Sequence, residues 1–132
     1  MIFFIRILHG KCIGGYMEQR RIQEFEYELW EAAKQRKKEP FEQTVHQDAA
    51  VISNSLRCSG EEYAMMLQDL GLEYYAIEQY ETIQKSADRI QNYYFLKVKT
   101  ECMKDMKSCH ATSTWERMPE GWRLMFHMHT AV

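Results

Sequence analysis

Apolar side chains in the first part of the chain recur at the spacing of one helix face. Four of them lie three or four residues apart: Ile22, Phe25, Leu29 and Ala33. Glutamate and arginine fill most positions between them, so the pattern predicts an amphipathic helix over residues 18–38. Pro40 cannot continue that helix but suits the first turn of another, which predicts a short helix over residues 40–46.

After residue 46 the period changes to the two-residue alternation of strands, with one further helix. Alternating segments predict strands over five ranges: 47–56, 74–84, 90–102, 106–118 and 122–130. Ser59 and Glu62 have the spacing of a capping box and Gly71 suits a helix end, so a third helix is expected over residues 60–70. This order predicts an α+β fold whose last four strands form a meander.

The two faces of the last two strands have different predicted roles, because neighbouring residues of a strand point to opposite sides. We expect a concave face that lines the core: Ser113, Trp115, Leu124, Phe126 and Met128. We expect a convex face that meets a partner subunit or water: His110, Thr112, Arg123, His127 and His129.

Composition narrows the class of protein. The 132 residues suffice for one domain, and 45% of them are hydrophobic and 27% charged, as in ordinary globular proteins. The net charge of −2 provides no basic footprint for nucleic acid. The four cysteines contain no C-x2-C pair, which argues against a zinc ribbon and favours reduced thiols in the cytoplasm.

Residues 1–16 form an extension before the predicted domain. Its apolar run over residues 2–8 is short and is interrupted by Arg6, so it suits neither a signal peptide nor a membrane span. Residues 14–17 read Gly-Gly-Tyr-Met, and glycine codons give a purine-rich stretch just before the Met17 codon, which resembles a bacterial ribosome-binding site read as protein. We therefore expect Met17 to be the native start and residues 17–132 to form a single domain. An extra strand or a disordered arm is the alternative for the extension.

The order of elements, together with several short motifs, resembles the nuclear transport factor 2-like superfamily, in particular its SnoaL-like, ketosteroid-isomerase-like bacterial branch. The matching segments are residues 29–33, 41–46, 47–51, 59–63, 112–116 and 121–124. The resemblance spans residues 17–130. It implies a cone-shaped α+β barrel in which the long N-terminal helices pack in a strongly curved mixed or antiparallel sheet around an internal pocket. It also implies a homodimer formed through the outer face of the sheet.

The same resemblance argues against ketosteroid-isomerase chemistry. Such isomerases use a carboxylate base, a tyrosine on the first helix and a buried protonated acid. The corresponding positions here are Ser53, Leu29 and Ser113, and none carries the required group. A serine without an adjacent base does not abstract a proton from carbon near neutral pH. The sequence offers no identifiable catalytic set and leaves open whether the protein is an enzyme.

An apolar pocket with a few polar groups is typical of a ligand site. The candidate pocket residues are Trp30, Ser53, Tyr63, Met66, Asn92, Tyr94, Ser113 and Trp115. As an alternative, the aromatic members simply fill the core and the backbone satisfies Asn92. A metal site formed by His110, His127 and His129 is a weaker hypothesis, because closed sites usually add a carboxylate or a cysteine and a second shell.

These observations predict a small-molecule-binding domain of the SnoaL-like type, cytoplasmic and dimeric, with no cofactor, nucleic acid or membrane partner. Two alternatives stay open. One is a SnoaL-like enzyme of the isomerase, cyclase or dehydratase class that acts on a small hydrophobic substrate. The other is an oligomerisation module, since this fold serves several functions.

Overall fold

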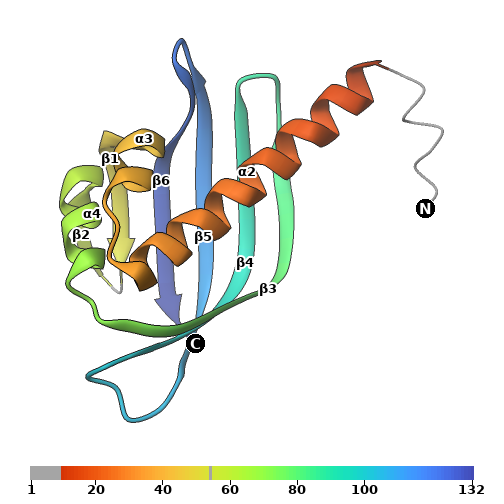
Figure 1. Ribbon diagram of the computed structural model, residues 1–132. Helices are drawn as coiled ribbons and strands as arrows, with labels where there is room; N and C mark the ends of the chain where they lie inside the picture. Colours follow the sequence, from red (N-terminus) through yellow and green to blue (C-terminus); the bar gives the residue numbers. More distant parts are fainter. Residues whose placement is uncertain (1–9, 54) are drawn as a thin grey trace.

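Among residues 10–53 and 55–132, three helices precede or interrupt a six-stranded sheet, and Figure 1 shows how they are arranged. The computed structural model describes residues 10–53 and 55–132, with side chains from Met17 onward. The elements in chain order are α2 (Gly10–Gln35), α3 (Glu39–Thr44), β1 (Val45–Ser53), β2 (Leu56–Ser59), α4 (Gly60–Gln68), β3 (Leu72–Lys85), β4 (Arg89–Thr100), β5 (Lys107–Met118) and β6 (Gly121–Ala131). The predicted α+β class is confirmed.

The sheet is mixed, with the strand order β2-β1-β6-β5-β4-β3. Strands β3 to β6 form the predicted antiparallel meander, and β1 then joins β6 in parallel. The long helix α2 crosses one face of this sheet, with α3 and α4 beside its C-terminal end (Figure 1). The strong curvature implied by the resemblance stays a prediction.

The core lies between α2 and the sheet. Ile22, Leu29 and Ala33 of the predicted helical stripe are all buried, and Phe25 packs with its ring centroid 5.7 Å from that of Trp115 on β5. Burying each large apolar side chain stabilises the fold by roughly 1.5–3 kcal/mol. This stripe therefore contributes most of the packing energy between α2 and the sheet.

The helix boundaries differ from the prediction at the start of the chain. Helix α2 begins at Gly10, so residues 10–16 are helical and do not form the extra strand considered above. Residues 1–9 lie outside the described residues, and the expected start at Met17 stays a prediction. In the part of the chain that the structure describes, no helix is long and apolar enough to cross a membrane.

A short strand that the sequence pattern did not predict, β2, lies between β1 and α4. The strand predicted over residues 47–56 ends at Ser53 as β1, and a short antiparallel partner, β2, begins at Leu56, with Ser55 at φ 77° between them. The predicted capping box is confirmed. Ser59 Oγ accepts from the amide of Glu62 at 3.1 Å, and the Glu62 carboxylate accepts from the Ser59 amide at 2.8 Å.

A β-bulge in β6 changes which residues face the helices. Thr114 pairs with Phe126 but Trp115 pairs with Leu124, so Met125 is an extra residue on β6. Beyond this bulge the alternation is shifted by one position. The prediction that Phe126 and Met128 line the core and that His127 and His129 lie on the outer face is therefore wrong. His127 and His129 face inward instead.

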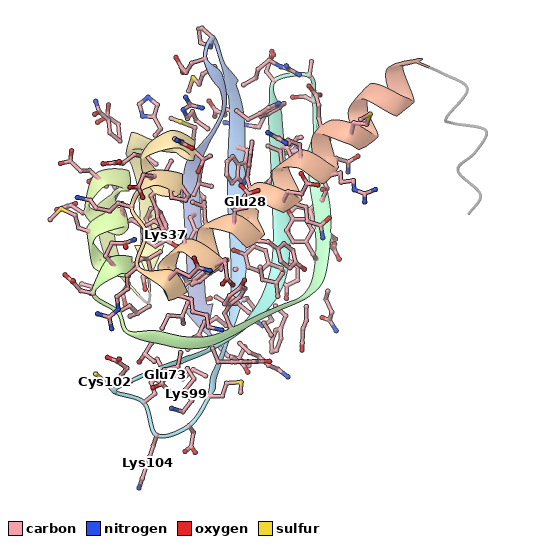
Figure 2. All side chains as sticks on the ribbon, viewed as in Figure 1. Glu28, Lys37, Glu73, Lys99, Cys102 and Lys104 are labelled. Carbon is pink, nitrogen blue, oxygen red and sulfur yellow. The ribbon has the colours of Figure 1, made fainter. Side chains whose placement is uncertain are left out.

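The β4–β5 connection lies at the opposite end of the molecule from the tip of the β5–β6 hairpin (Figure 1). Cys102 and Lys104 belong to this connection (Figure 2). Nearby, Lys99 Nζ on β4 forms an ion pair of 2.9 Å with the carboxylate of Glu73 on β3 (Figure 2). Both side chains are partly exposed, so this pair contributes at most about 1 kcal/mol. Cys58, Cys102 and Cys109 are free thiols.

Candidate functional site

A buried carboxyl group occupies the interior beside α2. Glu26 is only 2% exposed. It lies in the apolar stripe of the helix, four residues after Ile22 and three before Leu29, so helical geometry directs it into the core. A charged side chain is rarely buried without partners, because removing it from water is costly.

Three side chains from the sheet donate hydrogen bonds to this carboxyl group. Ser113 Oγ and Trp115 Nε1 of β5 both donate to Oε2, the indole at 3.1 Å. Tyr94 of β4 donates to Oε1 at 3.4 Å. Register explains the convergence, since Ser113 and Trp115 are two residues apart on β5 and therefore share its inner face.

Burial raises the pKa of Glu26 above its ordinary value of 4.5. The hydrogen bonds from Ser113, Trp115 and Tyr94 oppose that rise because they stabilise the ionised form, and nearby Asn92 acts in the same direction. Desolvation outweighs these donors. The geometry thus favours a carboxylic acid that holds its proton to a higher pH than an exposed glutamate does.

A tyrosine extends this network toward the C-terminal half of α2. Trp30 Nε1 donates to the Tyr94 hydroxyl at 2.9 Å, and this hydroxyl in turn donates to Glu26. Burial, followed by the nearby Glu26 charge, raises the pKa of Tyr94 well above its ordinary value. Tyr94 therefore keeps its proton and acts as a donor to the carboxyl group.

Two polar atoms close to this network lack a hydrogen bond of normal geometry to any described residue. The Asn92 side chain is fully buried; its Oδ1 accepts from Thr82 Oγ1 at 2.7 Å, while its Nδ2 lies near the Glu26 carboxyl without a hydrogen bond of normal geometry. The Tyr80 hydroxyl is also buried and unpaired, although its ring stacks on Tyr94 with centroids 5.6 Å apart. An unpaired buried polar group costs about 1–3 kcal/mol, so each needs an explanation.

A second polar cluster lies at the β1–β6 side of Trp30. Ser53 Oγ lies 2.9 Å from Nε2 of His129, and Nδ1 of His129 lies 3.1 Å from Nε2 of His127. The Trp30 ring contacts both imidazoles, each with centroids 6.3 Å apart. Tyr63 of α4 stacks on His127 at 5.6 Å. Trp30 thus connects the two polar clusters.

Burial keeps both inward-facing histidines neutral. Burial, followed by the neighbouring His129, lowers the pKa of His127 to about 3. Burial also lowers the pKa of His129 below 6.5. A neutral imidazole has one donor and one acceptor nitrogen, so each ring can both receive and pass on a hydrogen bond.

Most of the predicted pocket residues come together in the interior. Four of them interact with Glu26: Asn92, Tyr94, Ser113 and Trp115. Trp30 joins them through its hydrogen bond to Tyr94. Ser53 and Tyr63 join the histidine cluster.

Met66 is the exception. Its side chain is 39% exposed, so the prediction that it lies in the interior is wrong. The buried face of α4 contains Tyr63, Ala64 and Leu67, and Met66 lies on the side of Tyr63 away from Ala64.

The proposed metal-binding trio is not a cluster. His110 lies exposed on the outer face, where its Nδ1 is 2.6 Å from the Tyr93 hydroxyl. His127 and His129 lie on the inner face, because the bulge at Met125 reverses their direction. Among the side chains described, no group of three histidine, cysteine, aspartate or glutamate residues is arranged to hold a metal ion.

Glu26 is the functional candidate that the sequence analysis missed. Glu26 supplies an interior acid from α2, at a position other than Ser53, Leu29 and Ser113, where the resemblance led us to look for catalytic groups. Its position in the apolar stripe was a usable signal. Residues 22, 26, 29 and 33 lie three or four positions apart, so Glu26 fits the helical stripe as well as Phe25 does.

Comparison with known proteins gives a fold but no activity. No protein-family model and no curated protein sequence matches the chain. Among solved structures it is similar to an NTF2-like protein from Cytophaga hutchinsonii, with a TM-score of 0.76 and 18% identity over 86% of this chain and 98% of that one. It is also similar to a putative Ca/calmodulin-dependent kinase II association domain from Exiguobacterium sibiricum, with a TM-score of 0.75 and 14% identity over 87% and 93%.

The association domain of C. elegans CaMKII is a third similar structure, with a TM-score of 0.74 and 9% identity over 89% of this chain and 98% of that one. Similarity at this level of identity establishes the fold. The chain therefore has the nuclear transport factor 2-like fold, as its element order indicated.

Proposed function

We propose that this protein is a small-molecule-binding domain of the SnoaL-like type. Its ligand occupies the interior between α2 and the sheet, beside Glu26, Asn92 and Tyr80. The observation that carries this proposal is the buried Tyr80 hydroxyl, which has no hydrogen-bond partner among the described residues, together with the Asn92 amide nitrogen, which lies near Glu26 without a hydrogen bond of normal geometry. Ligand sites usually place a few such groups in an apolar lining.

The chemistry of these groups supports a particular class of ligand. The Asn92 amide nitrogen is a donor, and the Tyr80 hydroxyl donates or accepts. Glu26, whose pKa is raised by burial, adds a third donor when it is protonated. Together they suit an oxygen acceptor such as a carbonyl group. The stacked rings of Tyr80 and Tyr94 suit an apolar or aromatic body attached to that carbonyl.

Matched pairs of small molecules test this assignment. Acetophenone and α-methylstyrene have nearly the same shape, but only the ketone carries a carbonyl oxygen. Cyclohexanone and methylenecyclohexane form a second pair. We expect each ketone to raise the melting temperature of the protein more than its hydrocarbon partner, because a ligand that binds only the folded state stabilises it. Equal shifts within both pairs, or none, would overturn the proposal.

An enzyme of the isomerase, cyclase or dehydratase class is the alternative use of the same interior. Glu26 supports it, because a buried carboxyl group of raised pKa is suited to general acid–base work near neutral pH. Turnover distinguishes the two. A binding domain returns a bound ketone unchanged and without deuterium exchange at its α-carbon in D2O, whereas an acid–base enzyme promotes that exchange.

A second proposal concerns the outer face of the sheet. This face carries apolar side chains that are only half-buried: Ile52, Tyr93, Phe95, Phe126 and Met128. In a single chain such a surface would be left partly in water, and apolar sheet faces of this kind are frequent interfaces. Similarity to two association domains supports self-association of this chain, for which we propose a homodimer through this face. The free thiols of Cys58, Cys102 and Cys109 support a cytoplasmic location.

A further inference from the structure

A serine and two histidines form a continuous hydrogen-bonded chain where β1 and β6 run in parallel. The register pairs Ser53 with His129 and Val51 with His127. The backbone therefore places Ser53 Oγ 2.9 Å from Nε2 of His129, and Nδ1 of His129 lies 3.1 Å from Nε2 of His127. A hydroxyl, a base and a group that orients the base are the parts of an activated nucleophile, and their roles depend on geometry rather than on chain order.

We propose that Ser53 is a nucleophile for acyl transfer, with His129 as its general base and His127 as a positioning residue. This inference does not rest on the ligand site beside Glu26. In the arrangement required, the Ser53 hydroxyl donates to Nε2 of His129. The proton of His129 then lies on Nδ1 and is donated to Nε2 of His127.

The surroundings suit this role. Burial lowers the pKa of His129, so at pH 7 the imidazole is neutral and its Nε2, 2.9 Å from Ser53 Oγ, has a lone pair available, although the same burial makes it a weaker base than an exposed histidine. Ser53 is only half-buried, which leaves the hydroxyl accessible to a small ester. The Trp30 ring lies edge-on to His129, and Tyr63 stacks on His127. These aromatic walls favour an apolar or aromatic ester over a charged one.

The reaction balances without a cofactor. Oγ of Ser53 attacks the ester carbonyl and its proton passes to Nε2 of His129. As the ester C–O bond breaks, the alcohol leaves with that proton, and the acyl group stays on Oγ. Water then attacks the acyl-serine and gives its proton to His129. When the serine–acyl bond breaks, His129 returns the proton to Oγ, releasing the carboxylic acid.

Acylation of the purified full chain tests the proposal. We expect p-nitrophenyl acetate to add one acetyl group at Ser53, located by intact mass and peptide mapping. Ser53→Ala should abolish this adduct, and His129→Gln should slow it roughly 100-fold, since a general base contributes at least that factor. Ser55→Ala is the matched control, because Ser55 is exposed and two residues away. Acetylation that skips Ser53, or that proceeds equally fast in His129→Gln, would overturn the assignment.

The tautomer of His129 tests the role of His127 separately. We expect nitrogen NMR of the folded protein to show the proton of His129 on Nδ1, and His127→Leu to shift it toward Nε2 because the acceptor is lost. Acetylation of Ser53 should slow in parallel. A proton on Nε2 of His129 in the unmodified protein would overturn the proposal, because that nitrogen would then donate to Ser53 instead of accepting its proton.

Discussion

The neutral, buried His127 should make the fold acid-labile in a specific pH window. Its pKa is about 3 in the folded protein and 6.5 when the ring is exposed to water. The unfolded chain therefore binds a proton between these values and the folded protein does not. Stability contributed by this difference is present above pH 6.5 and is lost as the pH falls toward 3.

The magnitude follows from the pKa shift. At about 1.4 kcal/mol per pH unit, the full shift corresponds to roughly 5 kcal/mol, and the part lost between pH 7 and pH 4 is roughly 3 kcal/mol. His127→Phe removes the titrating group but keeps an aromatic ring against Tyr63, on which the imidazole stacks at 5.6 Å. Between pH 7 and pH 4, we expect the free energy of unfolding to fall by about 3 kcal/mol less in this variant than in the unmodified protein.

Urea denaturation at pH 7 and pH 4 measures this difference, and other titrating groups cancel in the comparison. His110→Phe is a matched control. His110 also stacks on a tyrosine, Tyr93, with the same interplanar angle of 28°, but it is exposed on the outer face. We expect the control to keep the full pH dependence. An unchanged pH dependence in His127→Phe would refute the reasoning.

Three further predictions follow from separate features. Met128→Glu places a charge in the proposed outer-face interface, and we expect analytical ultracentrifugation to show a monomer where the unmodified chain is a dimer; a monomer in both would contradict the interface. Because the pKa of Glu26 is raised in the folded state, its stabilising effect is lost as the pH rises. Urea denaturation should therefore show Glu26→Gln gaining stability relative to the unmodified protein between pH 4.5 and pH 7, and a constant difference would contradict this. Finally, the intact mass of the natively expressed protein should correspond to a start at Met17, and a product that begins at Met1 would exclude that start.

Local signals account for the parts of the fold that the sequence predicts well. The helical stripe that includes Ile22 and Leu29, and the capping box of Ser59 and Glu62, act over one or two turns, so both can be recognised in a short segment. The meander follows from consecutive strands joined by short connections, which tend to lie side by side.

The bulge at Met125 shows where local patterns fail. Strict alternation across β6 assigns Phe126 and Met128 to the core, but a single extra residue reverses every later side chain. The only local hint is the unbroken apolar run from Leu124 to Phe126, which departs from alternation. The faces before the bulge, including Leu124, are as predicted.

The polar interior could not be read from the chain for a different reason. The partners of Glu26 are 68, 87 and 89 residues away, so their convergence depends on the register of β4 and β5 and on the angle of α2. The pairing of Ser53 with His129 spans 76 residues and also requires the bulge. Such clusters are properties of the assembled fold.

The Tyr80 hydroxyl tests the proposed ligand site most directly. Tyr80→Phe keeps the ring that stacks on Tyr94 but removes an unpaired buried group. Urea denaturation without ligand should show a free energy of unfolding about 1 kcal/mol higher than in the unmodified protein, because an unsatisfied polar group is lost. The stabilisation by acetophenone should shrink in the same variant, while Tyr74→Phe, at an exposed position on the same strand, changes neither. A less stable Tyr80→Phe that keeps its full response to acetophenone would contradict the account.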